Sequence, residues 1–299
     1  MRFPARTVAT LGVLLLLVAA ALSAAEGEDS ALPCADCHDT VAADFQANPH
    51  AKALGRDAAT GAVCASCHAG GKEHVEGGGD AALIRIPRGA DAAGACLTCH
   101  GGTSHNDIAA KGFHAQAGVT CDTCHAIHGE KTPRPSLLRR TGSELCVSCH
   151  PDVRSSFRKT YTHPMHESVN GAGKGGMQCA ACHNPHGHDG ESHLKRTAAG
   201  EPACLGCHTE KRGPFVFSHG GLVAGTCQSC HEPHGSANPM MLTRARVAQV
   251  CLECHSNITG TSLGSQPPSL HDLTSPRYQN CTTCHVAVHG SNSSPLLVR

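Results

Sequence analysis

Residues 225–235 read GTCQSCHEPHG, and the five residues at their centre, Cys227–His231, decide how this chain is built. They place two cysteines three positions apart, with a histidine directly after the second. The same C-x-x-C-H pattern recurs at Cys34–His38, Cys64–His68, Cys96–His100, Cys121–His125, Cys146–His150, Cys179–His183, Cys204–His208, Cys251–His255 and Cys281–His285. Ten copies with two cysteines each account for all 20 cysteines of the chain.

This spacing is the one that attaches a haem covalently, because the two thiols add to vinyl groups on one edge of the ring and the histidine ligates the iron. A single copy would be a weak signal, since C-x-x-C also serves zinc and redox sites. Zinc ribbons need no histidine after every second cysteine, and disulfide scaffolds do not space all their cysteines identically. The sequence therefore predicts ten molecules of haem c. The predicted thioether cysteines are Cys34, Cys37, Cys64, Cys67, Cys96, Cys99, Cys121, Cys124, Cys146, Cys149, Cys179, Cys182, Cys204, Cys207, Cys227, Cys230, Cys251, Cys254, Cys281 and Cys284, and the predicted proximal ligands are His38, His68, His100, His125, His150, His183, His208, His231, His255 and His285.

The composition predicts that haem takes the place of a conventional core. The 299 residues include no Trp, 2 Tyr and 6 Phe, against 33 Gly and 17 Pro. Side chains of this kind bury too little apolar surface to offset the entropy of ordering the chain. We therefore expect a multihaem cytochrome c fold, mostly irregular with short α-helices, little or no β-structure and an elongated chain of haems. One short helix is expected over residues 151–159, because Pro151 suits a helix start.

Internal repeats predict the second axial ligands. Residues 34–128 resemble residues 146–234, and a partial third copy follows from Cys251. The matched histidines outside the motifs are His50, His74, His114, His128, His163, His186, His219, His234, His271 and His289, which is one for each of the ten irons.

Some of these ligand choices leave alternatives open. His166 competes with His163, and His188 competes with His186, because each lies only two or three residues away. His105 and His193 have no repeat counterpart and are expected to be loop residues. A methionine could also ligate iron in place of a distal histidine, with Met165, Met177, Met240 and Met241 as the candidates.

The first 25 residues are typical of a secretory signal peptide. Arg2 and Arg6 precede an apolar run over residues 8–22, and a small-residue cleavage site ends at Ala25. The mature chain is expected to form an N-terminal half, 26–145, with haems 1–4 and a C-terminal half, 146–299, with haems 5–10. The formal net charge of zero argues against a strongly basic nucleic-acid binder.

Three stretches carry a more specific resemblance: HPMHESVNGAGKGGMQCAACHNPHG (163–187), GTCQSCHEPHGSANPMML (225–242) and CTTCHVAVHGSNSSPLL (281–297). With them, essentially the whole mature chain resembles the decahaem c-type cytochromes of the MtrA/DmsE (PioA/MtoA) family. The resemblance implies a periplasmic electron carrier with histidine on both faces of each haem. It also implies insertion into an outer-membrane β-barrel of the MtrB type.

In that family, electrons pass between periplasmic or inner-membrane cytochromes and an extracellular cytochrome, reductase or mineral, in metal-oxide or DMSO-type respiration or in iron oxidation. Two alternatives stay open, a soluble periplasmic electron shuttle and a multihaem reductase. A reductase would need an iron with an open coordination position, which an altered motif commonly signals. None of the ten motifs departs from C-x-x-C-H, so we expect an electron carrier rather than an enzyme.

Overall fold

The computed structural model describes residues 32–54, 61–102, 112–128, 134–140, 142–165, 177–187, 194–220, 227–256 and 271–298. The predicted signal peptide lies outside these ranges, as do His105, His166, His188 and His193. The chain divides into two compact units, Met1–Thr141 and Gly142–Arg299.

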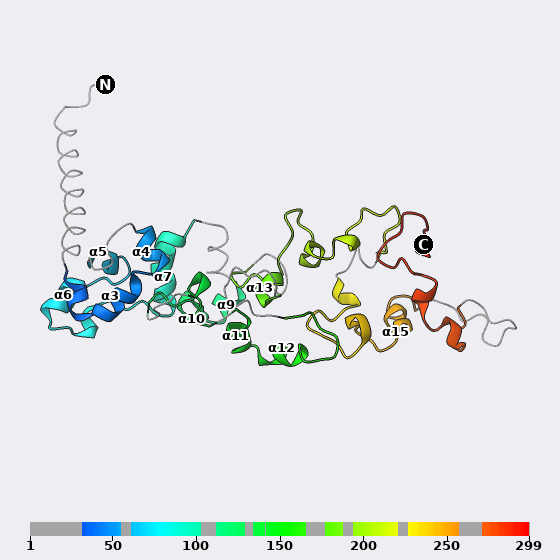
Figure 1. Cartoon of the computed structure of the whole chain (residues 1–299), viewed down its shortest axis with the longest axis horizontal. Helices are drawn as coiled ribbons and strands as arrows, with labels where there is room; N and C mark the ends of the chain where they lie inside the picture. The colour runs from blue at the N-terminus through cyan, green and yellow to red at the C-terminus, as the bar shows by residue number, and fades with distance from the viewer. Residues whose placement is uncertain are drawn as a thin grey trace, which may run out of the picture. The chain divides into compact units, whose positions relative to one another are not determined.

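The first unit is a series of short helices joined by irregular chain (Figure 1). Its α-helices are α2 (Cys34–Cys37), α3 (Asp39–Phe45), α4 (Pro49–Ala53), α5 (Gly61–Ala65), α6 (Gly71–Glu76), α7 (Ala90–His100), α9 (Phe113–Gln116) and α10 (Cys121–Cys124), and its 3-10 helices are η2 (Ala81–Leu83) and η3 (Pro135–Leu137).

The second unit is built in the same way, with more 3-10 turns (Figure 1). Its α-helices are α11 (Gly142–Val147), α12 (Pro151–Ser156), α13 (Cys179–Cys182) and α15 (Val247–Leu252), and its 3-10 helices are η5 (Ala203–Gly206), η6 (Thr209–Lys211), η7 (Cys227–Ser229), η8 (Pro239–Met241), η9 (Pro276–Tyr278) and η10 (Cys281–Thr283). The helix expected from residue 151 is confirmed as α12, which begins at Pro151 and ends at Ser156.

Each C-x-x-C-H motif forms about one helical turn. In α2, for example, the backbone N–H of His38 donates to the carbonyl oxygen of Cys34 at 2.9 Å, and the same bond closes the turn at Cys281–His285. Residues three apart lie on one face of such a turn, so the two cysteine side chains of a motif point to the same side. The motif spacing therefore presents both thiols to one edge of a bound ring.

Within the described ranges, extended structure is limited to isolated bridges, such as His125 with Leu138 and His231 with Leu242.

No large side chain in the described ranges is fully buried, and the buried apolar residues there are Ala51, Val63, Ala92, Leu137, Ala248 and Val250. Nor does any helix there combine the length and apolar character that crossing a membrane requires. The prediction of a mostly irregular chain with short helices and little β-structure is confirmed. The apolar core formed by the described residues is too small to be the main source of the protein's stability.

Candidate haem sites

The structure brings motif histidines and repeat-derived histidines together in pairs. Eight of the ten motif histidines have one of the nominated distal histidines opposite them, at ring-centre separations between 5.8 and 6.4 Å. The pairs, with the motif residue first, are His38 with His74, His68 with His128, His100 with His50, His183 with His234, His208 with His163, His231 with His289, His255 with His219 and His285 with His271.

These separations fit a haem iron between the two rings. Imidazoles bonded to opposite faces of one iron through bonds of about 2 Å place their ring centres roughly 6 Å apart. Direct packing of two rings does not explain one recurring distance at eight sites. The motif cysteines also suit the group, because every one of the 20 is at least partly exposed. The donor set therefore fits haem c with two axial histidines.

Four nominated histidines complete the set of twenty: His114, His125, His150 and His186. His114 lies in α9, and His150 directly precedes α12. The Nδ1 atom of His125 lies 2.7 Å from the carbonyl oxygen of Ser136. The backbone N–H of His186 donates to the Oδ1 atom of Asn184 at 3.3 Å.

The protein fixes the tautomer of many of these rings. The Nδ1–H group faces a backbone carbonyl in six of them, at 2.6 to 2.9 Å. The bonds are His68 to Arg85, His74 to Asp80, His125 to Ser136, His163 to Pro233, His231 to Met240 and His285 to Leu296. A proton held on Nδ1 would leave Nε2 to ligate iron, and the carbonyl acceptor would make the ring a stronger donor.

Three of these acceptor carbonyls sit in left-handed turns that contain no glycine. Ser136 and Leu137 have φ of 54° and 55°, Met240 and Met241 have 56° and 54°, and Leu297 has 57°. Such angles cost a non-glycine residue about 1–2 kcal/mol. Sequence reasoning missed these turns. The available signal was a proline followed two and three positions later by apolar residues, downstream of a motif, in the stretches PSLL (135–138), PMML (239–242) and PLLV (295–298).

The methionines considered as iron ligands make backbone contacts in the structure. The backbone oxygen of Met240, rather than its sulfur, supports the ring of His231 at 2.8 Å. Met165 pairs with Met177 in a parallel β-bridge. Methionine ligation of iron stays untested.

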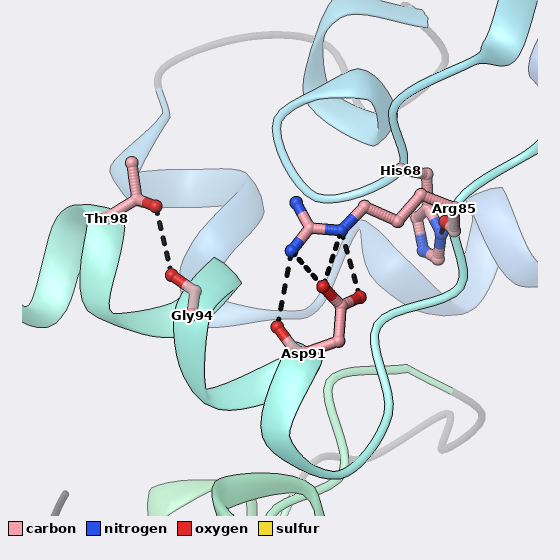
Figure 2. Close-up of polar contacts among 5 residues, drawn as sticks. All are labelled: His68, Arg85, Asp91, Gly94 and Thr98. Carbon is pink, nitrogen blue, oxygen red and sulfur yellow. Dashed lines mark hydrogen bonds and ion pairs between the residues drawn. The ribbon is translucent and has the colours of Figure 1, made fainter.

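The acceptor for His68 is held by an ion pair (Figure 2). The guanidinium of Arg85 donates to the Asp91 carboxylate through Nε at 2.9 Å and Nη2 at 2.5 Å, while the Arg85 carbonyl accepts from His68 Nδ1 at 2.9 Å. Hydrogen bonding by Arg85 holds the pKa of the Asp91 carboxyl below its usual range. Arg85 thus links Asp91 in α7 to His68, the predicted proximal ligand of the second motif.

Cysteines of successive motifs lie close together in space. First cysteines form side-chain hydrogen bonds in the pairs Cys34/Cys64, Cys96/Cys121, Cys146/Cys179, Cys204/Cys227 and Cys251/Cys281. Second cysteines lie close enough for one to add to the effect of burial in raising the pKa of the other, Cys99 that of Cys67, Cys207 that of Cys182 and Cys254 that of Cys230. Burial and then Cys121 raise the pKa of the Cys96 thiol to about 11, whereas a hydrogen bond with Cys146 lowers that of Cys179 to about 6. Within each unit, the edges that would carry consecutive haems therefore meet in sequence order, alternating between first and second cysteines.

The sequence matches known families of cytochromes. The family model "Doubled CXXCH motif" matches residues 114–155, 170–213 and 219–260, and "Cytochrome c7 and related cytochrome c" matches residues 21–101. Multihaem cytochrome MtrA of Shewanella baltica (strain OS185) is 32% identical over 289 residues, which cover 92% of this chain and 82% of the relative. The chain belongs to the MtrA family of multihaem c-type cytochromes. It is an electron carrier that binds haem c.

Burial lowers the pKa values of several predicted distal histidines in this MtrA-family cytochrome. It lowers the pKa values of His50, His128 and His234, and the paired motif histidines His100, His68 and His183 lower them further. Because only the neutral ring can donate Nε2 to a metal, a lowered pKa keeps these predicted ligands in the form that could bind iron at neutral pH.

Proposed function

We propose that this MtrA-family cytochrome holds ten haems, each attached through one C-x-x-C-H motif and ligated by histidine on both faces. Eight irons take the histidine pairs described above. By count, His114 and His186 are the remaining distal ligands, for the irons held by His125 and His150. Two imidazole ligands favour low reduction potentials relative to a histidine–methionine pair.

The observation that carries this proposal is the order of neighbouring cysteines. Within each unit, the cysteines of one motif lie near those of the next, in the first unit at Cys34 and Cys64, then at Cys67 and Cys99, then at Cys96 and Cys121. Covalent attachment at these positions fixes consecutive rings side by side. A conductor needs such a succession, whereas a catalytic site needs one iron with an open position.

The proposed route for electrons crosses the outer membrane. A chain that is largely irregular can occupy membrane depth only when protein encloses it, and a large β-barrel with a polar lumen provides that enclosure. We place the protein in the periplasm, associated with the outer membrane through a barrel of the MtrB type. Its electron partners would be periplasmic or inner-membrane cytochromes on one side and an extracellular cytochrome, reductase or mineral on the other, with no role for nucleic acid. Support comes from the predicted signal peptide at 1–25 and from the family.

Proteoliposomes test this route. The cytochrome and its barrel partner are reconstituted together or singly, with an electron acceptor trapped inside and a reductant outside. Transfer by the two together, and by neither alone, is the expected result. Equal transfer without the barrel, or failure of the two proteins to co-purify, would instead support the second candidate, a soluble periplasmic shuttle.

A further inference from the structure

One buried polar side chain near the third motif contacts a proposed distal ligand. Asn48 is only 3% exposed and directly precedes α4. Its Oδ1 atom accepts from the backbone N–H of His50 at 2.9 Å and lies 3.0 Å from Nδ1 of the same ring. Its Nδ2 group donates to the carbonyl oxygen of Ile127, the residue before His128.

These contacts define one consistent hydrogen-bonding state. When Nε2 of His50 faces the iron, Nδ1 carries the proton and donates to Asn48. The Oδ1 atom then accepts twice, which leaves the amide nitrogen to donate to Ile127. Both ends of a buried amide are satisfied, as burial requires. Asn48 therefore joins the ligand paired with His100 to the backbone beside the ligand paired with His68.

The second unit makes the same link without a side chain between. The repeats align His50 with His163 and His128 with His234. There, Nδ1 of His163 lies 2.9 Å from the carbonyl oxygen of Pro233, the residue before His234. In the first unit Asn48 bridges the histidine ring and the backbone carbonyl, whereas in the second unit the ring contacts the carbonyl directly.

The orientation of the His50 ring is also distinctive. Its plane makes 83° with that of His100, the largest angle among the eight pairs, whereas His163 and His208 make 57°. Four other pairs are within 17° of parallel. Since Asn48 binds both the backbone and the ring of His50, it holds this crossed arrangement.

We propose that Asn48 is a positioning residue that sets the ring orientation and the donor strength of His50 on the third haem. This inference rests on the proposed ligation of that haem by His50 and His100. Crossed axial rings leave two iron d orbitals nearly equal in energy, which gives a highly anisotropic low-spin EPR signal. Parallel rings separate those orbitals and give a rhombic signal. An acceptor on Nδ1 raises electron donation to the iron and lowers its potential.

Three substitutions in the fully loaded protein test the assignment. Asn48→Ser keeps a hydroxyl that can cap α4 but is too short to bridge to Ile127, and Asn48→Leu removes every polar contact. Both should convert one haem from the anisotropic to the rhombic class and shift its midpoint potential positive. Asn48→Asp offers a stronger, charged acceptor to the ring and should shift one haem negative. EPR and redox titration of each variant give both readouts.

Two controls separate the possible failures. Ala47→Asp adds the same charge at the neighbouring exposed position and should leave the third haem's EPR class unchanged. His50→Met should alter one haem; if it alters none, the proposed ligation by His50 fails. If His50→Met alters one haem while Asn48→Ser and Asn48→Leu retain the EPR classes and potentials of the wild type, Asn48 only caps α4 and the inference is overturned.

Discussion

The Nδ1 atom of His231 lies 2.8 Å from the carbonyl oxygen of Met240, at the centre of a turn in which both Met240 and Met241 have positive φ. The Met240 side chain is 79% exposed in the polypeptide, so the backbone conformation is its main contribution there. The left-handed conformation of this turn positions the Met240 carbonyl oxygen to accept a hydrogen bond from His231, a predicted iron ligand. Strained backbone at a functional site is expected to persist only where the surrounding structure holds it.

Substitutions at Met240 should follow the tolerance of each residue for a left-handed conformation. We expect thermal stability to fall in the order Gly, Met, Ile, Pro, with Met240→Ile costing about 1 kcal/mol, or about 2–4 °C in Tm. Met240→Pro should cost more, because proline cannot adopt positive φ, and should also change the EPR signal of one haem. Calorimetry of the loaded variants measures the order. Met165→Ile, at a position without positive φ, is the matched control and should cost less; equal losses at both positions would contradict the role of the turn.

The number of haems follows from the complete use of cysteine in ten motifs. The intact mass of the mature protein should exceed the mass of its chain by ten haems. Changing Cys281 and Cys284 together to Ala should remove one haem and leave nine, because thioether attachment at that motif is lost. A wild-type mass corresponding to eight haems or fewer would rule out the count.

Replacing a distal histidine should change one haem selectively. The centre of the His234 ring lies 6.0 Å from that of His183 and 5.4 Å from that of Phe157. His234→Met should give one haem a distinct EPR signature and a more positive potential, since a thioether favours the reduced iron. His193→Met is the control, because His193 has no repeat counterpart. An unchanged spectrum for His234→Met would remove His234 from the ligand set.

The ion pair between Arg85 and Asp91 should contribute a pH-dependent part of stability. Because Arg85 lowers the pKa of the folded Asp91 carboxyl, the contribution is present above the unfolded pKa, about 4, and is lost as the pH falls through the lower folded value. Asp91→Asn should therefore lower Tm slightly at pH 7 and have no effect once the carboxyl is protonated. The pair is exposed, so 1 M salt should shrink the difference at pH 7. A difference that persists in strong acid would point to packing rather than charge.

The sequence predicted the features that depend on local spacing and composition. Two cysteines and a histidine define a turn by themselves, and Pro151 signals the start of α12. Pairings such as His50 with His100 depend on contacts between distant segments, which spacing alone does not specify. The backbone acceptors, such as the carbonyl oxygen of Pro233 that faces His163, could not be predicted from the sequence either. Every residue has a backbone carbonyl, and only the fold decides which carbonyl faces a histidine ring.

The described part of the chain buries no large side chain completely, and this has a consequence for how the protein is made. With so small an apolar interior in the described residues, an unfinished molecule has no stable shape to which it could return, so folding and cofactor attachment become a single event. A copy released before its haems are attached would stay open to proteases. Degradation would then act as quality control, removing incomplete molecules before they could interrupt electron transfer.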